Sequence, residues 1–223
     1  MNRIRATPAT FALLTLIAIV YAFELLSGAV SDDMTLVHMG ANIPGIFARG
    51  DYWRLLTAMF LHAGWLHVLS NCWALYQLGG LYEALFGRTR FLAIYFLTGI
   101  GASVASALRL DYQFLAHNIA GSSVGASGAV FGILGAFIFS IRRSPRYRHD
   151  PHLKSLIPQL VFWILLNLVI GYEVPQIDNT AHLTGLGLGL LLGFLPHRVP
   201  PPPPGNWVID VPPQPSPPPQ NQP

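Results

Sequence analysis

The chain has 223 residues, of which 52% are hydrophobic and only 10% are charged, and its mean hydropathy is +0.45. Soluble domains carry about 25% charged residues, so this composition excludes an ordinary soluble protein and predicts an all-α, polytopic membrane protein. The net charge of +3 does not indicate nucleic-acid binding, because basic residues beside apolar segments are topology signals. The single cysteine, Cys72, excludes an internal disulfide.

Six apolar segments are predicted to cross the membrane, since a spanning helix needs about 20 residues. In chain order they cover residues 10–28, 58–81, 91–110, 127–141, 155–171 and 179–195. The first segment follows Arg3 and Arg5 as a secretory signal would, but it is too long for one and is predicted to remain as a helix.

The segment between the first two predicted spans, residues 29–57, is too long for a turn and too apolar to be fully solvated. We expect it to lie partly in the outer interface, where Trp and Tyr are favoured. Ten basic residues fall on the side of the two termini and three on the other side, which predicts cytoplasmic termini. With no visible organelle-targeting segment, a bacterial cytoplasmic membrane is the favoured location.

The predicted organisation has three parts: a short cytoplasmic N-terminus at 1–9, a six-helix membrane domain at 10–198 and a tail at 199–223. The tail contains 12 of the 19 prolines and almost no charge, so it is predicted to be extended and disordered. Either a proline-binding partner or a plain solvated tail is compatible with this composition.

Polar residues recur near the start of the second, fourth and sixth predicted helices, which all descend from the outer face. The second carries His62, His67 and Asn71, the fourth carries Ser127 and the sixth carries His182. Polar groups at membrane depth are costly and usually mark a working site. A serine and a histidine at one depth suggest a nucleophile and its base.

The fourth predicted helix is too short to span the bilayer. Its 15 residues, 127–141, reach about 22 Å, against a hydrocarbon thickness of about 30 Å. Ser127 is therefore expected below the outer surface, with residues 111–126 dipping into the bilayer as irregular backbone. Such backbone requires burial in protein or a water-filled cavity.

Each of these residues also has a purely structural interpretation. Ser127 is a possible helix N-cap and His182 a possible core residue with a satisfied hydrogen bond. His67 and Asn71 share one helix face, either to stabilise an oxyanion or to form an interhelical network. Asp178 is compatible with a triad or a cap, and a Ser–His dyad is the preferred interpretation.

Glycines recur at helical spacing on the fourth and sixth predicted helices. They are Gly128, Gly132 and Gly135 on the fourth, and Gly185 and Gly189 on the sixth, in line with His182. Small faces allow helices to approach closely, which would bring Ser127 within hydrogen-bond reach of His182. Ordinary membrane packing uses the same motifs.

Taken together, these motifs resemble the rhomboid intramembrane serine proteases over most of the chain. The matching elements are Tyr52-Trp53-Arg54, His62-x4-His67-x3-Asn71, Gly79-Gly80 followed by Glu83 and Gly87, Gly125-Ala126-Ser127-Gly128, and Ala181-His182-x2-Gly185-x3-Gly189. No departure occurs at the catalytic positions.

The resemblance implies a six-helix rhomboid-like bundle that cleaves transmembrane segments of single-pass membrane proteins within the lipid, without metal or cofactor. It implies Ser127 as nucleophile and His182 as base, with an oxyanion site formed by His67, Asn71 and the Ser127 backbone N–H. The implied supporting residues are Trp53, Arg54, His62, Glu83, Gly125, Gly128, Gly185 and Gly189. It also implies that residues 155–171 and 172–178 form a gate.

Three alternatives remain open at this point. A catalytically inactive relative would bind client transmembrane helices without cleaving them. A transporter would also use broken helices whose N-termini point at a polar cavity. Metal binding by His62, His67 and His182 is disfavoured, because no His-Glu-x-x-His pattern occurs. The patterns do not encode the substrate, the cleavage site or the oligomeric state.

Overall fold

The computed structural model describes residues 7–174 and 176–195, and within these ranges the chain is helical with no strand. The elements in order are α2 (Pro8–Ser27), α3 (Asp33–Met39), α4 (Ile46–Arg49), α5 (Arg54–Thr57), α6 (Trp65–Ala74), the π-helical turn η1 (Leu75–Gly79), α7 (Gly80–Phe86), α8 (Arg88–His117), α9 (Ser127–Arg143), α10 (Pro151–Glu173) and α11 (Asn179–Phe194). The all-α prediction is confirmed for these residues. The predicted tail at 199–223 lies outside them.

Among the described residues, three helices are long and apolar enough to cross a membrane, namely α2, α8 and α10. The short helices α9 and α11 have 17 and 16 residues, about 26 and 24 Å. Between α2 and α8, the stretch from Trp65 to Phe86 is helical throughout but contains the η1 turn. Length and apolarity therefore support three crossings, and the six-span arrangement stays a prediction.

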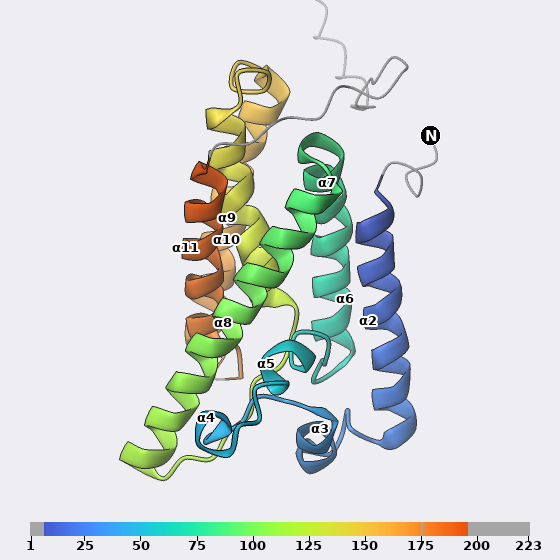
Figure 1. Cartoon of the computed structure of the whole chain (residues 1–223), viewed down its shortest axis with the longest axis vertical. Coiled ribbons are helices and arrows are strands. Elements are labelled where there is room, and N and C mark those ends of the chain that lie inside the picture. The colour runs from blue at the N-terminus through green and yellow to red at the C-terminus, as the bar shows by residue number, and fades with distance from the viewer. Residues whose placement is uncertain (1–6, 175, 196–223) are drawn as a thin grey trace, which may run out of the picture.

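The centre of the bundle is the contact of α9 with α11. A Cβ atom added at Gly185 would lie 2.0 Å from the carbonyl oxygen of Gly128, and one added at Gly189 would lie 2.0 Å from that of Gly132. The two backbones therefore touch along this stripe, as the glycine spacing predicted. Figure 1 shows α9 and α11 side by side with α8 crossing them.

The start of α9 lies deep along α8. A Cβ atom at Gly128 would lie 2.5 Å from that of Ala102, and α8 continues from residue 102 to His117, which is 117 − 102 = 15 residues or about 22 Å further. Figure 1 shows α8 running on past the start of α9 toward α4. We call the end of the bundle that carries α3 and α4 the α3 end, and the opposite end the α7 end.

The prediction that all of 111–126 is irregular was wrong in its first half. Helix α8 extends to His117 and ends where Asn118 adopts a left-handed conformation with φ 56°. No glycine or proline interrupts 111–117, so nothing in this stretch stops the helix earlier. The irregular segment is 118–126.

The segment 29–57 is more ordered than predicted, because it contains α3, α4 and α5. Arg54 holds it together by donating from Nη1 to the carbonyl oxygens of Val37 (2.6 Å) and Ala41 (3.0 Å). Trp53 lies against the Arg54 guanidinium, 4.6 Å from ring centroid to Cζ. These two residues stabilise the α3 end and lie away from the serine.

At the α7 end, the Glu83 carboxylate joins α7 to the start of α2. It accepts hydrogen bonds from the backbone N–H groups of Ala9 (3.0 Å) and Thr10 (2.8 Å) and from the Thr10 hydroxyl (2.8 Å). These are donors that the first turn of a helix leaves free. Glu83 is therefore a structural residue that anchors α2.

The α9–α11 contact generates a direct test of packing. We expect Gly189→Ala to lower the free energy of unfolding by about 1–3 kcal/mol, because the new methyl group meets backbone that cannot yield. Gly187→Ala on the same helix is the matched control, since a Cβ there meets nothing within 4 Å. Thermal unfolding in detergent measures both, and equal stabilities of the two variants would contradict the packing.

Candidate active site

Ser127 is placed by the irregular segment 118–126. Asn42 and Ser123 form an isolated antiparallel bridge, and the Gly125 N–H donates to the Ala58 carbonyl at 2.8 Å. Gly125 has φ +125°, a conformation that side chains rarely adopt, and its missing Cβ would lie 2.7 Å from Nε2 of His67. The chain then enters α9 at Ser127, which is half-buried.

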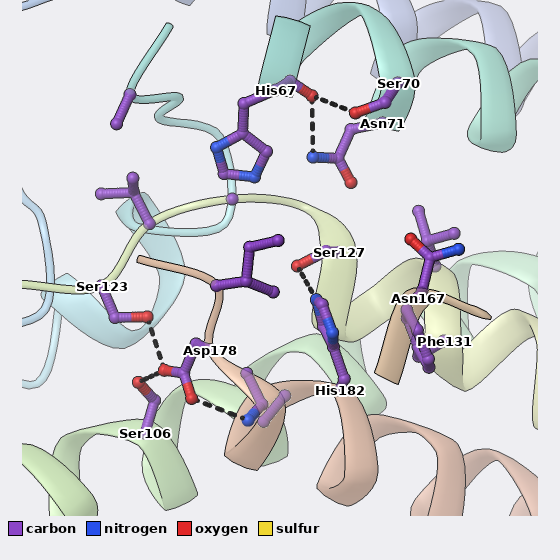
Figure 2. A pocket seen from close by; sticks show the side chains of 18 of the residues that line it. His67, Ser70, Asn71, Ser106, Ser123, Ser127, Phe131, Asn167, Asp178 and His182 are labelled. Carbon is purple, nitrogen blue, oxygen red and sulfur yellow. Dashed lines mark hydrogen bonds between the residues drawn. The ribbon is translucent and has the colours of Figure 1, made fainter. Parts of the chain in front are cut away.

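His182 lies in the first turn of α11 and faces Ser127. Its Nε2 is 3.0 Å from the Ser127 Oγ, and the side chain is buried. The imidazole stacks on the Phe131 ring, with centroids 4.2 Å apart and planes 4° apart. Figure 2 shows the two side chains pointing toward each other from opposite helices. The structure thus brings the predicted nucleophile and base into hydrogen-bond contact.

Phe131 was missed by sequence reasoning, although it lies one turn after Ser127 on the same face of α9. A residue four positions after a candidate nucleophile must lie beside whatever that nucleophile contacts. Phe131 limits the rotation of the His182 ring and so keeps Nε2 directed at Ser127.

Among the described residues, the Asp178 carboxylate makes no hydrogen bond to the His182 ring, and the His182 backbone N–H donates to the Asp178 carbonyl at 3.1 Å as part of the helix. Its Oδ1 caps α11 by accepting from the N–H groups of Thr180 (3.1 Å) and Ala181 (3.2 Å). Its Oδ2 accepts from Ser106, from Ser123 (2.9 Å) and from Arg109 Nη2 (3.2 Å). Nδ1 of His182 is buried and has no hydrogen-bond partner among the described residues. The geometry is therefore that of a Ser–His pair rather than a triad.

The Asp178 cluster joins three elements whose relative positions set the site. Ser106 and Arg109 come from α8, Ser123 from the segment before Ser127, and Asp178 from the start of α11. Burial alone raises the pKa of the Asp178 carboxyl. The Ser106 hydroxyl, the Arg109 charge and the other hydrogen bonds outweigh burial and hold the pKa below its ordinary value.

His67 and Asn71, the two predicted oxyanion donors on α6, both line the cavity at Ser127. The Asn71 Nδ2 donates to the His67 backbone carbonyl at 3.0 Å, which leaves the second N–H of the amide. The His67 ring lies over Gly125. Backbone N–H groups at the start of α9 add further donors, because a helix leaves its first N–H groups without intrahelical partners.

His62 is fully buried outside the cavity and supports His67 from behind. The two rings meet edge to face with centroids 5.0 Å apart. The backbone N–H of His62 donates to Oε1 of Glu24 at 2.8 Å. Glu24, a buried carboxyl on α2, was not singled out from the sequence, because an acidic residue inside an apolar run has no motif around it.

The predicted site residues thus fall into two groups. Those that line the cavity are His67, Asn71, Gly125, Ser127, Gly128 and His182. Those that support the fold elsewhere, through packing or hydrogen bonds, are Trp53, Arg54, His62, Glu83, Gly185 and Gly189.

The cavity has a volume of about 1060 Å³ and is lined by parts of α6, α8, α9, α10 and α11 and by the segment before Ser127. Figure 2 shows the labelled polar side chains gathered around this space. Within the described part of the chain, no group of three His, Cys, Asp or Glu side chains is arranged to hold a metal ion. The donors present suit acyl transfer, since a nucleophile, a base and several N–H groups converge.

Comparison with known proteins adds independent information. The family model for the rhomboid domain matches residues 49–199. The chain is 33% identical over 177 residues to rhomboid protease GluP of Bacillus subtilis (79% of this chain, 32% of GluP). It is 39% identical over 164 residues to RHOMBOID-like protein 1 of Arabidopsis thaliana (73% and 39%). It is 31% identical over 207 residues to rhomboid protease AarA of Providencia stuartii (85% and 73%). The chain therefore spans about a third of GluP.

The Asp178 cluster predicts a pH-dependent stability. A lowered pKa means that the carboxylate contributes stability above its ordinary pKa of 3.8 and loses it as the pH falls through the lower folded value. We expect Asp178→Asn to cost about 1–3 kcal/mol at neutral pH, with the difference from the native protein shrinking below about pH 4.

The control is Asp150→Asn, which makes the same change at a carboxylate that caps α10 through two bonds to Oδ1, and the asparagine oxygen can still accept both. Thermal unfolding between pH 3 and 8 compares the two variants. If both substitutions cost the same, the bonds to Ser106, Ser123 and Arg109 contribute nothing.

Proposed function

This chain belongs to the rhomboid family, and on that premise we propose that it is an intramembrane serine endopeptidase that cleaves transmembrane segments of single-pass membrane proteins. The observation that carries the proposal is the 3.0 Å contact between the Ser127 Oγ and the His182 Nε2 beside a large cavity. If Ser127 served only to cap the start of its helix, no histidine side chain would be needed within hydrogen-bond distance of its Oγ.

In the proposed reaction, His182 takes the proton of Ser127 as Oγ attacks the scissile carbonyl carbon. The bond from Oγ to carbon forms, and the carbonyl electron pair moves to oxygen. His182 then gives the proton to the departing amine, and the peptide bond breaks. Water attacks the acyl-enzyme by the reverse route, with His182 again as base. Stacking on Phe131 keeps the ring in place during both transfers.

The negative oxygen of the intermediate requires donors that are already aimed at it. We assign this role to the Ser127 backbone N–H, to the free N–H of the Asn71 amide and to His67. The start of α9 also supplies the positive end of the helix dipole. His62 and Glu24 then act indirectly, by supporting His67.

We further propose that residues 10–198 form a six-span membrane domain with both termini in the cytoplasm. The short helices support this arrangement, because the 15 residues of α8 beyond Ala102 leave Ser127 well below the α3 end. The α3 end would then be the outer end. A bacterial cytoplasmic membrane is the proposed location, and no step of the proposed reaction uses a metal or cofactor.

Replacing the nucleophile tests the function. We expect Ser127→Ala to abolish cleavage of a model transmembrane substrate in liposomes, because Ser127 supplies the hydroxyl that contacts the His182 imidazole. A fluorophosphonate probe is expected to label the native protein at Ser127 and to leave this variant unlabelled. A native protein that neither cleaves nor reacts with the probe would instead be a binder of client helices.

Replacing the oxyanion donors tests the assignment of roles. We expect His67→Ala to lower kcat by about 10²–10³-fold with little change in KM, since the interaction forms only in the transition state. Asn71→Ala should cost less, because one of its N–H groups is already bonded within α6. Cys72→Ala, next to Asn71, is the control. A rise in KM at unchanged kcat would assign both residues to ground-state binding.

A further inference from the structure

The cavity at Ser127 continues between α6 and α10, where both helices expose hydrogen-bonding side chains. These are Ser70 and Gln77 on the α6 side and Gln159 and Asn167 on α10, and all four line the cavity. Exposed amides on apolar helices at membrane depth are costly without a partner. Figure 2 shows Ser70 and Asn167 close to the Ser127–His182 pair, whereas Gln77 and Gln159 have no part in the site described above.

One aromatic contact fixes the register of the two helices. Trp73 and Trp163 meet edge to face with centroids 6.3 Å apart. The helices run in opposite directions, since Tyr147, just before α10, donates to the Leu85 carbonyl at the end of α7. Gln77 follows Trp73 by four residues and Gln159 precedes Trp163 by four. The two glutamines therefore lie at the same depth, on the α7 side of the tryptophan contact.

The amides of this glutamine pair are largely unused. The Gln77 side chain makes no hydrogen bond within the described ranges, and Gln159 donates only to the Ser155 carbonyl, at 3.4 Å. A glutamine amide offers two donors and two acceptor positions. The pair thus presents several free hydrogen-bonding groups to the space between α6 and α10.

That space is open because α10 packs loosely. Only Leu153, Leu160, Ile164 and Gly171 are buried along its 23 residues. A lipid acyl chain in the cleft would satisfy no amide, whereas a polypeptide with a polar side chain would. Continuity with Ser127 makes the membrane-embedded part of a substrate the matching occupant.

The distance between the two glutamines and the Ser127–His182 pair indicates which position of a substrate they would contact. Gln159 precedes Asn167, which lines the cavity near the dyad, by 167 − 159 = 8 residues or about 12 Å along α10. A substrate covers about 12 Å with roughly eight residues if helical and roughly four if extended.

We propose that Gln77 and Gln159 form a specificity site for a substrate that carries an amide or hydroxyl side chain about four to eight residues after the scissile bond. This inference rests on the proposed function and assumes a substrate whose N-terminus lies at the α3 end. The substrate side chain and the two glutamines form hydrogen bonds with one another at a depth where lipid acyl chains offer no hydrogen-bonding groups.

The test uses the full chain in liposomes with pairs of model single-pass substrates. Each pair carries Gln or Met at one position, scanned from two to twelve residues after the scissile bond. Gln and Met have similar helix propensities, so the comparison isolates hydrogen bonding. We expect the native protein to prefer the Gln substrate by about fivefold in kcat/KM, only within the window of four to eight residues.

The variant Gln77→Leu/Gln159→Leu replaces both amides with apolar side chains at exposed positions, so it should fold and cleave the Met substrates as the native protein does. Its preference for Gln should fall to about onefold. The control Tyr76→Phe/Ser155→Ala removes hydroxyls from the same two helices outside the cavity, with Tyr76 facing Phe11, and should keep the preference.

Two outcomes overturn the specificity site while leaving the protease intact: a leucine variant that still prefers Gln, or a native protein that cleaves both substrates equally at every position. A native protein that cleaves none of the substrates would refute the proposed function itself, and the specificity site with it.

Discussion

The close backbone contact between α9 and α11 is the constraint on which the site depends. Gly185 and Gly189 lie against the carbonyl oxygens of Gly128 and Gly132 with no room for a side chain. Ser127 and His182 occupy the first turns of these same helices, so the helix separation sets the distance between their side chains. A single methyl group in the stripe would move both helices and with them the 3.0 Å contact. The packing of α9 against α11 therefore also determines the geometry of the Ser127–His182 pair.

Much of this could be predicted from sequence, because the relevant signals are local. The start of α9 at Ser127, the facing glycines and the position of His182 on α11 all follow from helical spacing and from the cost of polar groups in lipid. Sequence spacing alone also allowed Asp178 to be part of a triad. Only the fold shows that its carboxylate is occupied by α8 and by the helix cap.

What could not be predicted depends on contacts between distant segments. Helix α8 continues past residue 110 to His117, and the sequence carries no marker there that distinguishes helix from irregular backbone. Helices α3, α4 and α5 are too short to produce a periodic hydrophobic pattern. Glu24 and His62 are 38 residues apart in sequence and meet only when α2 packs beside α6. Likewise, the common depth inferred for Gln77 and Gln159 follows from the register set by Trp73 and Trp163.

The contacts between the α3 end and the segment 118–126 affect how a substrate of the proposed protease would enter the cavity. Arg54 binds the carbonyls of Val37 and Ala41, the neighbouring Asn42 pairs with Ser123, and the chain reaches Ser127 four residues later. Moving the α3 end away from the cavity would therefore also displace Ser127. Parting α10 from α6 disturbs few buried side chains and leaves Ser127 untouched. For the proposed protease, this arrangement favours lateral entry of a substrate between α6 and α10, while the contacts at the α3 end hold Ser127 in position.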